Sequence, residues 1–469
     1  MNIKHQEIEI PPNNPFKNCK LGRRKYGELL TDIVETYSDG FVISIDNQWG
    51  SGKTTFVKMW KQHLENEEFK TLYFNAWVND FDGSPLIAIL SELRTIVSNK
   101  KVKTFDDLLS KGAIITKNVL PGIAKAIAKK YIDMDAVSDA IEEATKSAAE
   151  ILKDDIDEYL NKKNGLIDFK VELADFIQKN TNGKPLIFIV DELDRCRPNY
   201  AVEILENIKH FFSVKGIVFV LSIDKAQLGN AIKGFYGSDL IDSNEYLRRF
   251  IDIEYHIPEP DRDMFTRYLC DYYEFDEFFN ANERKHRDLA DDKNRFLDIA
   301  NILFESHNSS LRQQEKIVSH ARVTLNTFPK TNYIFPDVFV VLIFLRDMYK
   351  DFYWEIRNRK LTPQQFVDKL QGVLPPISDN FNISSLIYLA ARIINFYHTY
   401  YQEVNYSSKI IDRDEKTGEK ILLITSLFPA SYDKAFLEAL DQPAFRSENG
   451  VRISYLLNKI DLLENFLDT

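Results

Sequence analysis

The segment FVISIDNQWGSGKTTFVKMW, residues 41–60, decides the fold of this 469-residue chain. An apolar run comes first, a Gly-rich turn follows, and a stretch with apolar residues at helical spacing completes the segment. A phosphate chain needs backbone N–H groups, glycines that allow close approach, a helix amino terminus and one ammonium group. This strand, loop and helix supply all four, so we predict that the loop binds the phosphates of a nucleotide.

The loop residues have separate expected tasks. Lys53 would bridge the β- and γ-phosphates of ATP, and Thr54 would hold Mg²⁺. Asn47 stands where such a loop usually begins with Gly, and Asn tolerates positive φ better than other non-Gly residues. The residues expected to surround the phosphates are Trp49, Gly50, Ser51, Gly52, Lys53, Thr54 and Thr55.

A second motif, LIFIVDELDR at residues 186–195, joins an apolar run to acidic residues. A carboxylate at a strand end can lie beside the bound Mg²⁺, and a second one can polarise an attacking water. We assign Asp191 to the metal and Glu192 to the general base. An acidic strand end is common by itself, and its pairing with the phosphate loop makes this motif specific.

Apolar runs alternate with helical patterns from residue 41 to about residue 260, which is typical of βαβ units and an α/β fold with a parallel sheet. Nearly all-apolar strands agree, because parallel strands are buried on both faces. The runs are FVISID (41–46), TLYF (71–74), PLIFIV (185–190), GIVFVLSI (216–223) and FIDIEYHI (250–257).

Outside these runs, the sequence pattern predicts mainly helices. Residues 1–260 are expected to form the nucleotide-binding domain, with an Ala-, Lys- and Glu-rich helical insertion at about 100–165. A helical lid at 261–330 and a mostly helical carboxy-terminal domain at 331–469 would follow, with a hairpin or wing in DRDEKTGEKILLIT (412–425). The longest apolar run, Val338–Leu345, is too short to cross a bilayer and predicts a buried helix.

Composition limits the classes of function. The chain has 60 Lys and Arg against 71 Asp and Glu, a net charge of −11. This balance argues against a surface devoted to nucleic acid, although a local basic groove is compatible with it. Cys19, Cys196 and Cys270 lack the spacing of a zinc site or disulfide, and the amino terminus lacks a secretory signal. We therefore expect a cytoplasmic protein without a transmembrane segment.

With these motifs together, the chain resembles the KAP family of P-loop NTPases, within the larger class that includes the AAA+ and STAND ATPases. The resemblance implies an additional-strand P-loop fold. It rests on PFKNCKLGRRKYGELL (15–30), QWGSGKTTFVKMW (48–60), LYFNAWVND (72–80), IFIVDELDRCRP (187–198), IKHFFSVKGIVFVLSIDKAQL (208–228) and YLRRFIDIEYHIPEP (246–260).

The resemblance implies further roles near the nucleotide. Asp224 matches the family's polar sensor of the γ-phosphate, with Ser222 as second choice, and capping of the following helix is an equal alternative for Asp224. Trp77 is expected to pack in the core. Asp194 and Arg195 are expected to form an internal ion pair or a relay behind the site.

Three arginines also acquire expected roles from the resemblance. Arg249, preferred over Arg248, matches the residue that reaches a neighbouring subunit's nucleotide, and Arg312 matches a lid residue that touches nucleotide. A surface charge is the alternative for both. Arg23 lies in the segment that the family places near the adenine, where a simple turn is the alternative.

The family likeness implies a slow Mg²⁺-dependent ATPase that works as a switch or assembly subunit, in bacterial anti-phage defence, with a separately encoded effector and a homo-oligomeric state. The alternatives are a non-hydrolysing scaffold and a nucleic-acid-stimulated motor. Many KAP proteins carry transmembrane helices where this chain has its charged insertion. This chain resembles a soluble variant.

Overall fold

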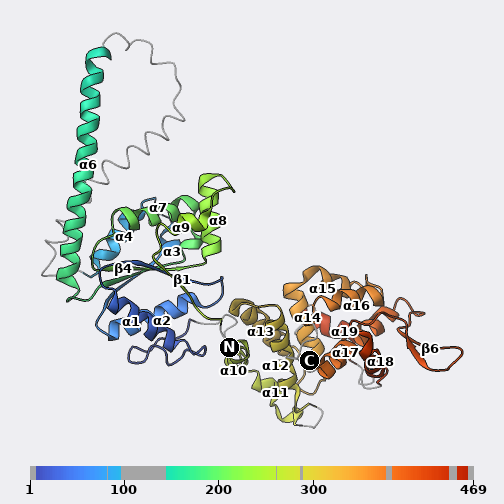
Figure 1. Ribbon diagram of the computed structural model, residues 1–469. Coiled ribbons are helices and arrows are strands. Elements are labelled where there is room, and N and C mark those ends of the chain that lie inside the picture. The colour runs from blue at the N-terminus through green and yellow to red at the C-terminus, as the bar shows by residue number, and fades with distance from the viewer. Residues whose placement is uncertain are drawn as a thin grey trace. The chain divides into compact units, whose positions relative to one another are not determined.

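The computed structural model describes residues 7–81, 83–96, 144–259, 261–285, 289–375, 383–442 and 451–462 (Figure 1). The chain divides into two units, Ile8–Pro258 and a second unit made of the described residues from Glu259 onward together with Glu7. Residues 100–143 of the helical insertion expected at about 100–165 lie outside the described residues. From Ala144 the chain forms one long helix, α6 (Ala144–Asn180).

The first unit is built on a five-stranded parallel sheet with the order β2-β3-β4-β1-β5. Strand β4 therefore lies between β1, which leads into the phosphate loop, and β3, which ends in the acidic motif. The expected α/β fold is confirmed. The strands are β1 (Val42–Asp46), β2 (Lys70–Asn75), β3 (Leu186–Asp191), β4 (Ile217–Ile223) and β5 (Ile253–His256).

Helices cover both faces of this sheet (Figure 1). Helices α1 (Arg24–Thr36) and α2 (Lys53–Asn66) pack on one face. The other face is covered by α4 (Pro85–Arg94), α7 (Pro198–His210), α8 (Lys225–Tyr236) and the C-terminal part of α6. Short elements join them: α3 (Ala76–Asn79), the 3₁₀ turn η1 (Leu193–Arg195) and α9 (Ser243–Leu247).

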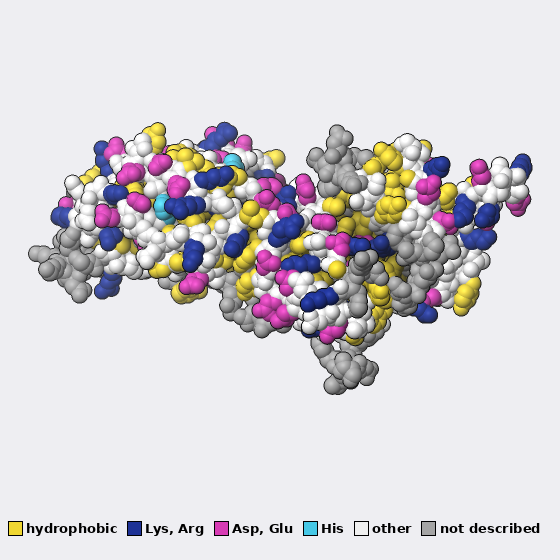
Figure 2. Space-filling view, turned by 90° about the horizontal axis from the view of Figure 1, so that it is seen from below, with side chains coloured by type: hydrophobic (Ala, Val, Ile, Leu, Met, Phe, Trp, Pro, Cys, Tyr) yellow, Lys and Arg dark blue, Asp and Glu magenta, His cyan; other side chains and the backbone are white. Residues whose placement is uncertain are grey.

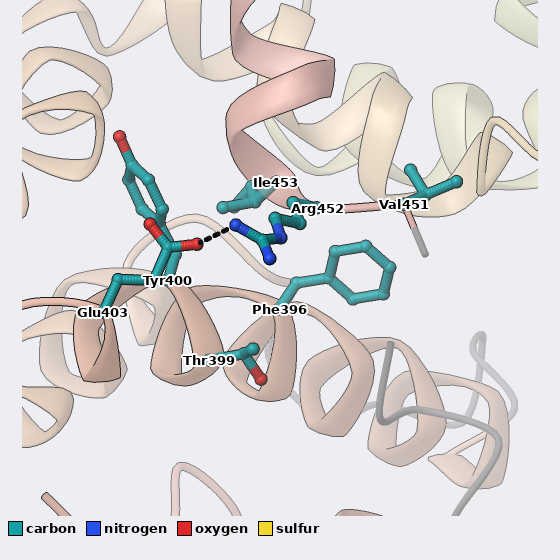
Figure 3. Close-up of a pocket in the computed structure, with 7 residues that line it drawn as sticks. All are labelled: Phe396, Thr399, Tyr400, Glu403, Val451, Arg452 and Ile453. Atoms are coloured by element: carbon teal, nitrogen blue, oxygen red, sulfur yellow. Dashed lines mark hydrogen bonds and ion pairs between the residues drawn. The ribbon is translucent and has the colours of Figure 1, made fainter. Parts of the chain in front are cut away.

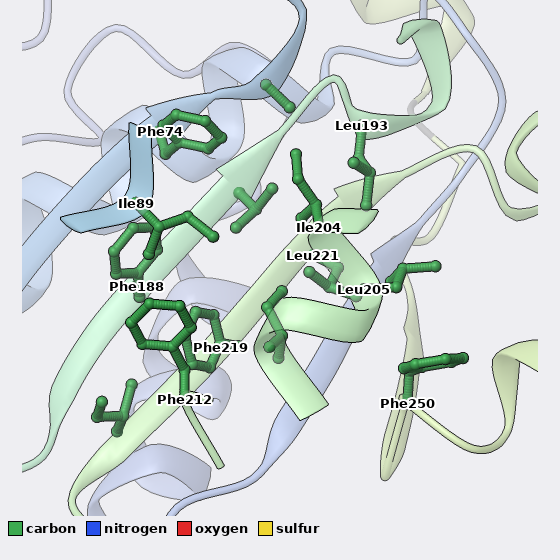
Figure 4. Packing of buried hydrophobic residues seen from close by; sticks show 14 of the residues in the cluster. Phe74, Ile89, Phe188, Leu193, Ile204, Leu205, Phe212, Phe219, Leu221 and Phe250 are labelled. Atoms are coloured by element: carbon green, nitrogen blue, oxygen red, sulfur yellow. The ribbon is translucent and has the colours of Figure 1, made fainter. Parts of the chain in front are cut away.

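Strand β3 is buried along its whole length, and its side chains alternate between the two cores. Phe188 and Val190 belong to the core beneath α4 and α7, whereas Ile187 and Ile189 face α1 and α2. Figure 4 shows the aromatic part of the first core, where the ring centroids of Phe188 and Phe219 lie 5.2 Å apart. This packing fixes the ends of the central strands.

The second unit is mainly helical. Its helices are α10 (Arg262–Tyr272), α11 (Asp276–Phe279), α12 (Asp292–Ser306), α13 (Leu311–Leu325), α14 (Pro336–Met348), α15 (Lys350–Arg357), α16 (Pro363–Gln371), α17 (Ile383–Gln402), α18 (Asp433–Leu440) and α19 (Ile453–Ile460). The 3₁₀ turns are η2 (Asn282–Arg284) and η3 (Ala430–Tyr432). Strands β6 (Ile411–Arg413) and β7 (Lys420–Leu422) form the expected hairpin.

The apolar run Val338–Leu345 lies in α14 and is buried throughout, as predicted. Arg284, which is fully buried, pairs with Asp292 and also donates to the Lys330 and Asn332 carbonyl oxygens, at 3.0 and 2.7 Å. Within the described ranges, no helix combines the length and hydropathy needed to span a membrane.

Candidate nucleotide site

The candidate site lies at the carboxyl ends of β1, β3 and β4. Between β1 and α2 the chain makes a tight loop in which Gly50 and Gly52 have φ values of 80° and 81°. Side chains other than Gly rarely adopt this left-handed conformation. Gly52 is also the residue that precedes α2, so the loop delivers backbone N–H groups at a helix amino terminus.

Lys53 is the first residue of α2, and its side chain folds back over the loop. The residue is only 8% exposed. Its Nζ donates to the carbonyl oxygen of Asn47 and, at 3.1 Å, to that of Gln48. The ammonium group is therefore held inside the turn that a phosphate chain would occupy.

Carboxylates surround this ammonium group. Burial lowers the pKa of Lys53, and neighbouring acidic groups oppose the shift. Their negative charge favours the protonated ammonium in a poorly solvated site. The opposing groups are Asp194, Asp224, Asp46 and Asp191.

Asp224 connects the end of β4 to the loop. Its Oδ1 accepts a hydrogen bond from the backbone N–H of Gln227 at 3.2 Å and so caps α8. Its Oδ2 accepts from the backbone N–H of Trp49 at 3.2 Å. Helix capping by Asp224 is thus confirmed for one of its carboxylate oxygens. Its role as a γ-phosphate sensor stays a prediction. Ser222 is buried, and its hydroxyl has no hydrogen-bond partner among the described residues.

The acidic motif begins where β3 ends. Asp191 is 1% exposed and accepts a hydrogen bond from the Tyr73 hydroxyl at 2.7 Å. Glu192 follows with φ 59°, an uncommon conformation for a residue other than Gly. Its Oε1 pairs with Arg195 Nη1 at 2.7 Å, and its Oε2 accepts from Asn75 Nδ2 at 3.0 Å.

Sequence reasoning missed Tyr73 and Asn75, both on β2. The available signal was the polar end of the run TLYFN, since Asn75 lies opposite Asp191 in the sheet register. Sequence order alone does not say that β2 pairs with β3.

Two expectations for this region are wrong: the ion pair between Asp194 and Arg195, and the buried position of Trp77. Asp194 accepts a hydrogen bond from Trp49 Nε1, whereas Arg195 pairs with Glu192, and both residues belong to the turn η1. The alternative of a relay behind the site stays a prediction. Trp77 is 54% exposed instead of buried, and the Arg195 guanidinium lies over its ring at 5.6 Å.

Arg23 lies against the phosphate loop. Although only 2% exposed, it donates from Nη2 to the Ser51 carbonyl oxygen at 2.8 Å and from Nη1 to that of Gly52 at 3.2 Å. Burial lowers the pKa of this guanidinium. The contacts make Arg23 a support of the loop, and its expected place near the adenine stays a prediction.

The oxygen groups present fit Mg²⁺. This ion favours oxygen ligands and usually keeps several waters, so that one or two protein groups suffice. Thr54 and Asp191 offer a hydroxyl and a carboxylate, and the buried Ser51 hydroxyl has no partner among the described residues. In those same ranges no cluster of three or more His, Cys, Asp or Glu side chains forms a protein-only metal site.

Arg249 lies at the other end of the sheet. It lies four residues before β5, whose start is joined to the start of β1 by the bond from Asp252 N to the Val42 carbonyl oxygen, at 2.9 Å. The length of β1 therefore separates Arg249 from Lys53, roughly 15 Å at the usual rise per residue. Arg249 thus lies away from its own loop.

A cavity of about 330 Å³ opens beside Arg249, and Lys209 and Lys215 add two more cations to its wall. Asp39 and Asp252 also line it. Arg312 is an exposed residue of α13 in the second unit.

The second unit contains a much smaller crevice between α17 and the start of α19 (Figure 3). Its space is about 10 Å³, enough for about one water molecule. Arg452 crosses it toward Glu403, with Nη1 3.4 Å from Oε1. On the face shown in Figure 2, Lys and Arg side chains are interspersed with Asp and Glu.

The β1-loop-α2 geometry, the acidic end of β3 and the intervening β4 define a P-loop NTPase. A model of the KAP family P-loop domain matches residues 23–327. This range covers more than half of the chain, which therefore belongs to the KAP family.

Two individual proteins extend the comparison. The Phage T7 exclusion protein of Escherichia coli strain K12 is 19% identical over 278 residues, which are 54% of this chain and 34% of that protein. The chain thus spans about a third of that relative's length. The alignment with the ORC2 protein of Aeropyrum pernix covers 89% of this chain and 94% of that chain at 14% identity, with a TM-score of 0.33.

We expect Asp194→Asn to change the pH dependence of stability. Burial raises the pKa of Asp194 above its ordinary 3.8, so the stability linked to its protonation is present below that value and is lost as pH rises through the folded-state pKa. The difference in free energy of unfolding, variant minus wild type, should therefore increase as pH rises from about 4 to 7.

Thermal unfolding across this pH range measures that difference. Trp49→Phe is the control, because it removes the hydrogen bond that lowers the pKa of Asp194 and keeps the titrating carboxyl group. The free energy of unfolding of Trp49→Phe should therefore decrease relative to that of the wild type as pH rises. A difference between Asp194→Asn and the wild type that stays constant with pH would contradict this account.

Arg23→Ala should weaken nucleotide binding roughly tenfold, because the loop loses the side-chain hydrogen bonds to the carbonyl oxygens of Ser51 and Gly52. Titration with a non-hydrolysable ATP analogue measures the affinity. The neighbouring Arg24→Ala is the matched control, since Arg24 makes only an exposed pair with Glu28. Equal affinity of folded Arg23→Ala and wild type would show that the loop keeps its shape without the guanidinium.

Proposed function

We propose that this KAP protein is a slow Mg²⁺-dependent ATPase that acts as a nucleotide-driven switch or assembly subunit. The observation that carries the proposal is the convergence of Lys53 with Asp191 and Glu192 at one edge of the sheet. A buried ammonium, a carboxylate at the metal position and an adjacent base are the parts that phosphoryl transfer to water requires.

In this mechanism the loop N–H groups and Lys53 bind the β- and γ-phosphates and hold them in line for attack. Thr54 and Asp191 would hold Mg²⁺, which neutralises charge on the phosphates when bound. Glu192 accepts a proton from the attacking water at its carboxylate. Asp224 senses the γ-phosphate through the Trp49 backbone that it already contacts.

The likeness to a phage exclusion protein supports a role in anti-phage defence. The chain spans about a third of that relative's length, and we assign the output of the system to a separately encoded effector as part of the proposal. Loss of the γ-phosphate would release an ordered interface or the lid that carries Arg312. The proposed setting is a cytoplasmic homo-oligomer.

Two alternatives lead to different results in one assay. A scaffold would bind ATP without turnover, and a nucleic-acid motor would hydrolyse faster with DNA or RNA. The net charge of −11 disfavours the motor.

We expect Lys53→Ala to abolish ATP binding and Glu192→Gln to bind ATP but hydrolyse it at least about 100-fold more slowly, because an amide cannot accept the proton. Binding titrations and phosphate-release assays, run with and without DNA or RNA, measure both effects. Turnover of Glu192→Gln at the wild-type rate would assign the base to another residue. Unchanged ATP affinity in folded Lys53→Ala would overturn the site.

Arg249→Ala should hydrolyse ATP slowly by itself and regain part of the activity when mixed with Lys53→Ala. The first protein supplies an intact nucleotide site and the second supplies the arginine, which acts on a neighbour's γ-phosphate. Arg248→Ala is the matched control and should keep the wild-type rate. A mixture no faster than its components, or a wild type that remains monomeric with ATP in light scattering, would make Arg249 a surface charge.

A further inference from the structure

Both carboxylate oxygens of Glu192 are already engaged. Oε1 pairs with Arg195 Nη1 at 2.7 Å and Oε2 accepts from Asn75 Nδ2 at 3.0 Å. The side chains of Glu192 and Arg195 are 15% and 23% exposed, so solvent weakens this pair less than a surface ion pair. A general base must direct a lone pair at the attacking water. In this arrangement the guanidinium occupies one oxygen of the base.

The two partners of Glu192 differ in what they can do. Asn75 is the last residue of β2, opposite Asp191 in the sheet, and its Oδ1 accepts from Val78 N at 2.9 Å, so its amide is fixed and orients the carboxylate. Arg195 ends the short turn η1 and reaches Glu192 with a long side chain. Withdrawal of Arg195 would leave Glu192 oriented by Asn75 and would free Oε1 to accept a proton.

Arg195 is held from its other side by Trp77. The guanidinium lies over the indole ring, 5.6 Å from its centre, and a cation over a tryptophan face is attracted to it. Trp77 is the second residue of α3 and is 54% exposed. The group that holds Arg195 against the base is therefore at the protein surface.

Further contacts join α3 to the acidic motif. Asp80, directly after α3, accepts from Arg197 N at 2.7 Å and from Arg197 Nε at 2.9 Å. The segments 75–80 and 192–197 are thus linked at both ends and again in the middle, where Trp77 contacts Arg195. A displacement of α3 would be passed to Glu192.

We propose that Arg195 restrains the general base Glu192, and that the exposed ring of Trp77 holds Arg195 in the restraining position. This inference rests on the proposed function, since it assigns the regulation of the same base. Arg195 is a positioning residue: it acts on the reaction only through Glu192. Turnover then rises when Arg195 leaves Glu192.

Steady-state kinetics of Arg195→Gln tests the restraint. We expect kcat to rise by roughly fivefold, the factor that corresponds to about 1 kcal/mol, with KM for ATP unchanged. Arg195→Lys keeps a cation beside Glu192 and should stay near the wild-type rate. Arg24→Gln removes an exposed Arg–Glu pair elsewhere and is the matched control. A kcat equal to or below that of the wild type in Arg195→Gln would overturn the restraint.

Trp77→Leu provides a second test that does not depend on the stability of η1, because the side chain is largely exposed. It should raise kcat in the same direction, by a smaller factor. Phe81→Leu is the control: Phe81 is 85% exposed and lies close by in the sequence, so its loss should leave kcat unchanged. Equal effects of the two changes, or no effect of Trp77→Leu, would remove Trp77 from the proposal.

Tryptophan emission gives a readout that is independent of hydrolysis. Arg195→Gln should change the emission of the wild type by removing the cation from Trp77, and the same change made in Trp77→Phe should have no effect. A spectral change that persists in the Trp77→Phe background would place the effect of Arg195 elsewhere.

Glu192→Gln separates the two levels of the argument. The double variant Arg195→Gln/Glu192→Gln should be as slow as Glu192→Gln, because the restraint has no base to release. If Glu192→Gln hydrolyses ATP at the wild-type rate, the proposed function fails. If Glu192→Gln is inactive and Arg195→Gln turns over at the wild-type rate, only the restraint fails.

Discussion

The register of the parallel sheet is the constraint on which the site depends. One row of paired residues runs from Asn75 through Asp191 and Ser222 to Ile45. The polar residues of this row come from segments far apart in the chain, and parallel pairing brings them to a single edge. A shift of one residue in any central strand would turn the side chains of that strand to the opposite face of the sheet. The buried phenylalanines that lock β3 against β4 therefore also protect the chemistry at the strand ends.

Electrostatics adds a second layer to this constraint. One buried ammonium, that of Lys53, lies among four carboxylates and donates to two loop carbonyls. Phosphates entering the loop would bring more negative charge into the same poorly solvated space. The hydroxyl and carboxylate oxygens already present would suit a divalent cation that offsets this charge.

Much of this arrangement could be predicted from the sequence. The five strands, the loop and the acidic strand end were all predictable, because each depends on residues close together in the chain. Tyr73 and Asn75 were missed, because their contacts cross from β2 to β3 and local sequence patterns do not predict the order of strands in a sheet. The prediction of an ion pair between Asp194 and Arg195 was wrong for a related reason. The positive φ of Glu192 and the turn that follows decide which way Asp194 and Arg195 point.

The opposite positions of Lys53 and Arg249 on the sheet have a consequence for any assembly in which one copy's arginine serves another's nucleotide. Such a contact joins two different surfaces: a two-fold dimer would make it twice, once in each direction, whereas a head-to-tail assembly would make it once at each interface. A closed ring would supply every nucleotide with an arginine. An open row would not: the copy at one end would hold nucleotide without the arginine it needs, and the copy at the other end would present an arginine to solvent. Closure of the ring would then determine whether the last bound nucleotide can be hydrolysed.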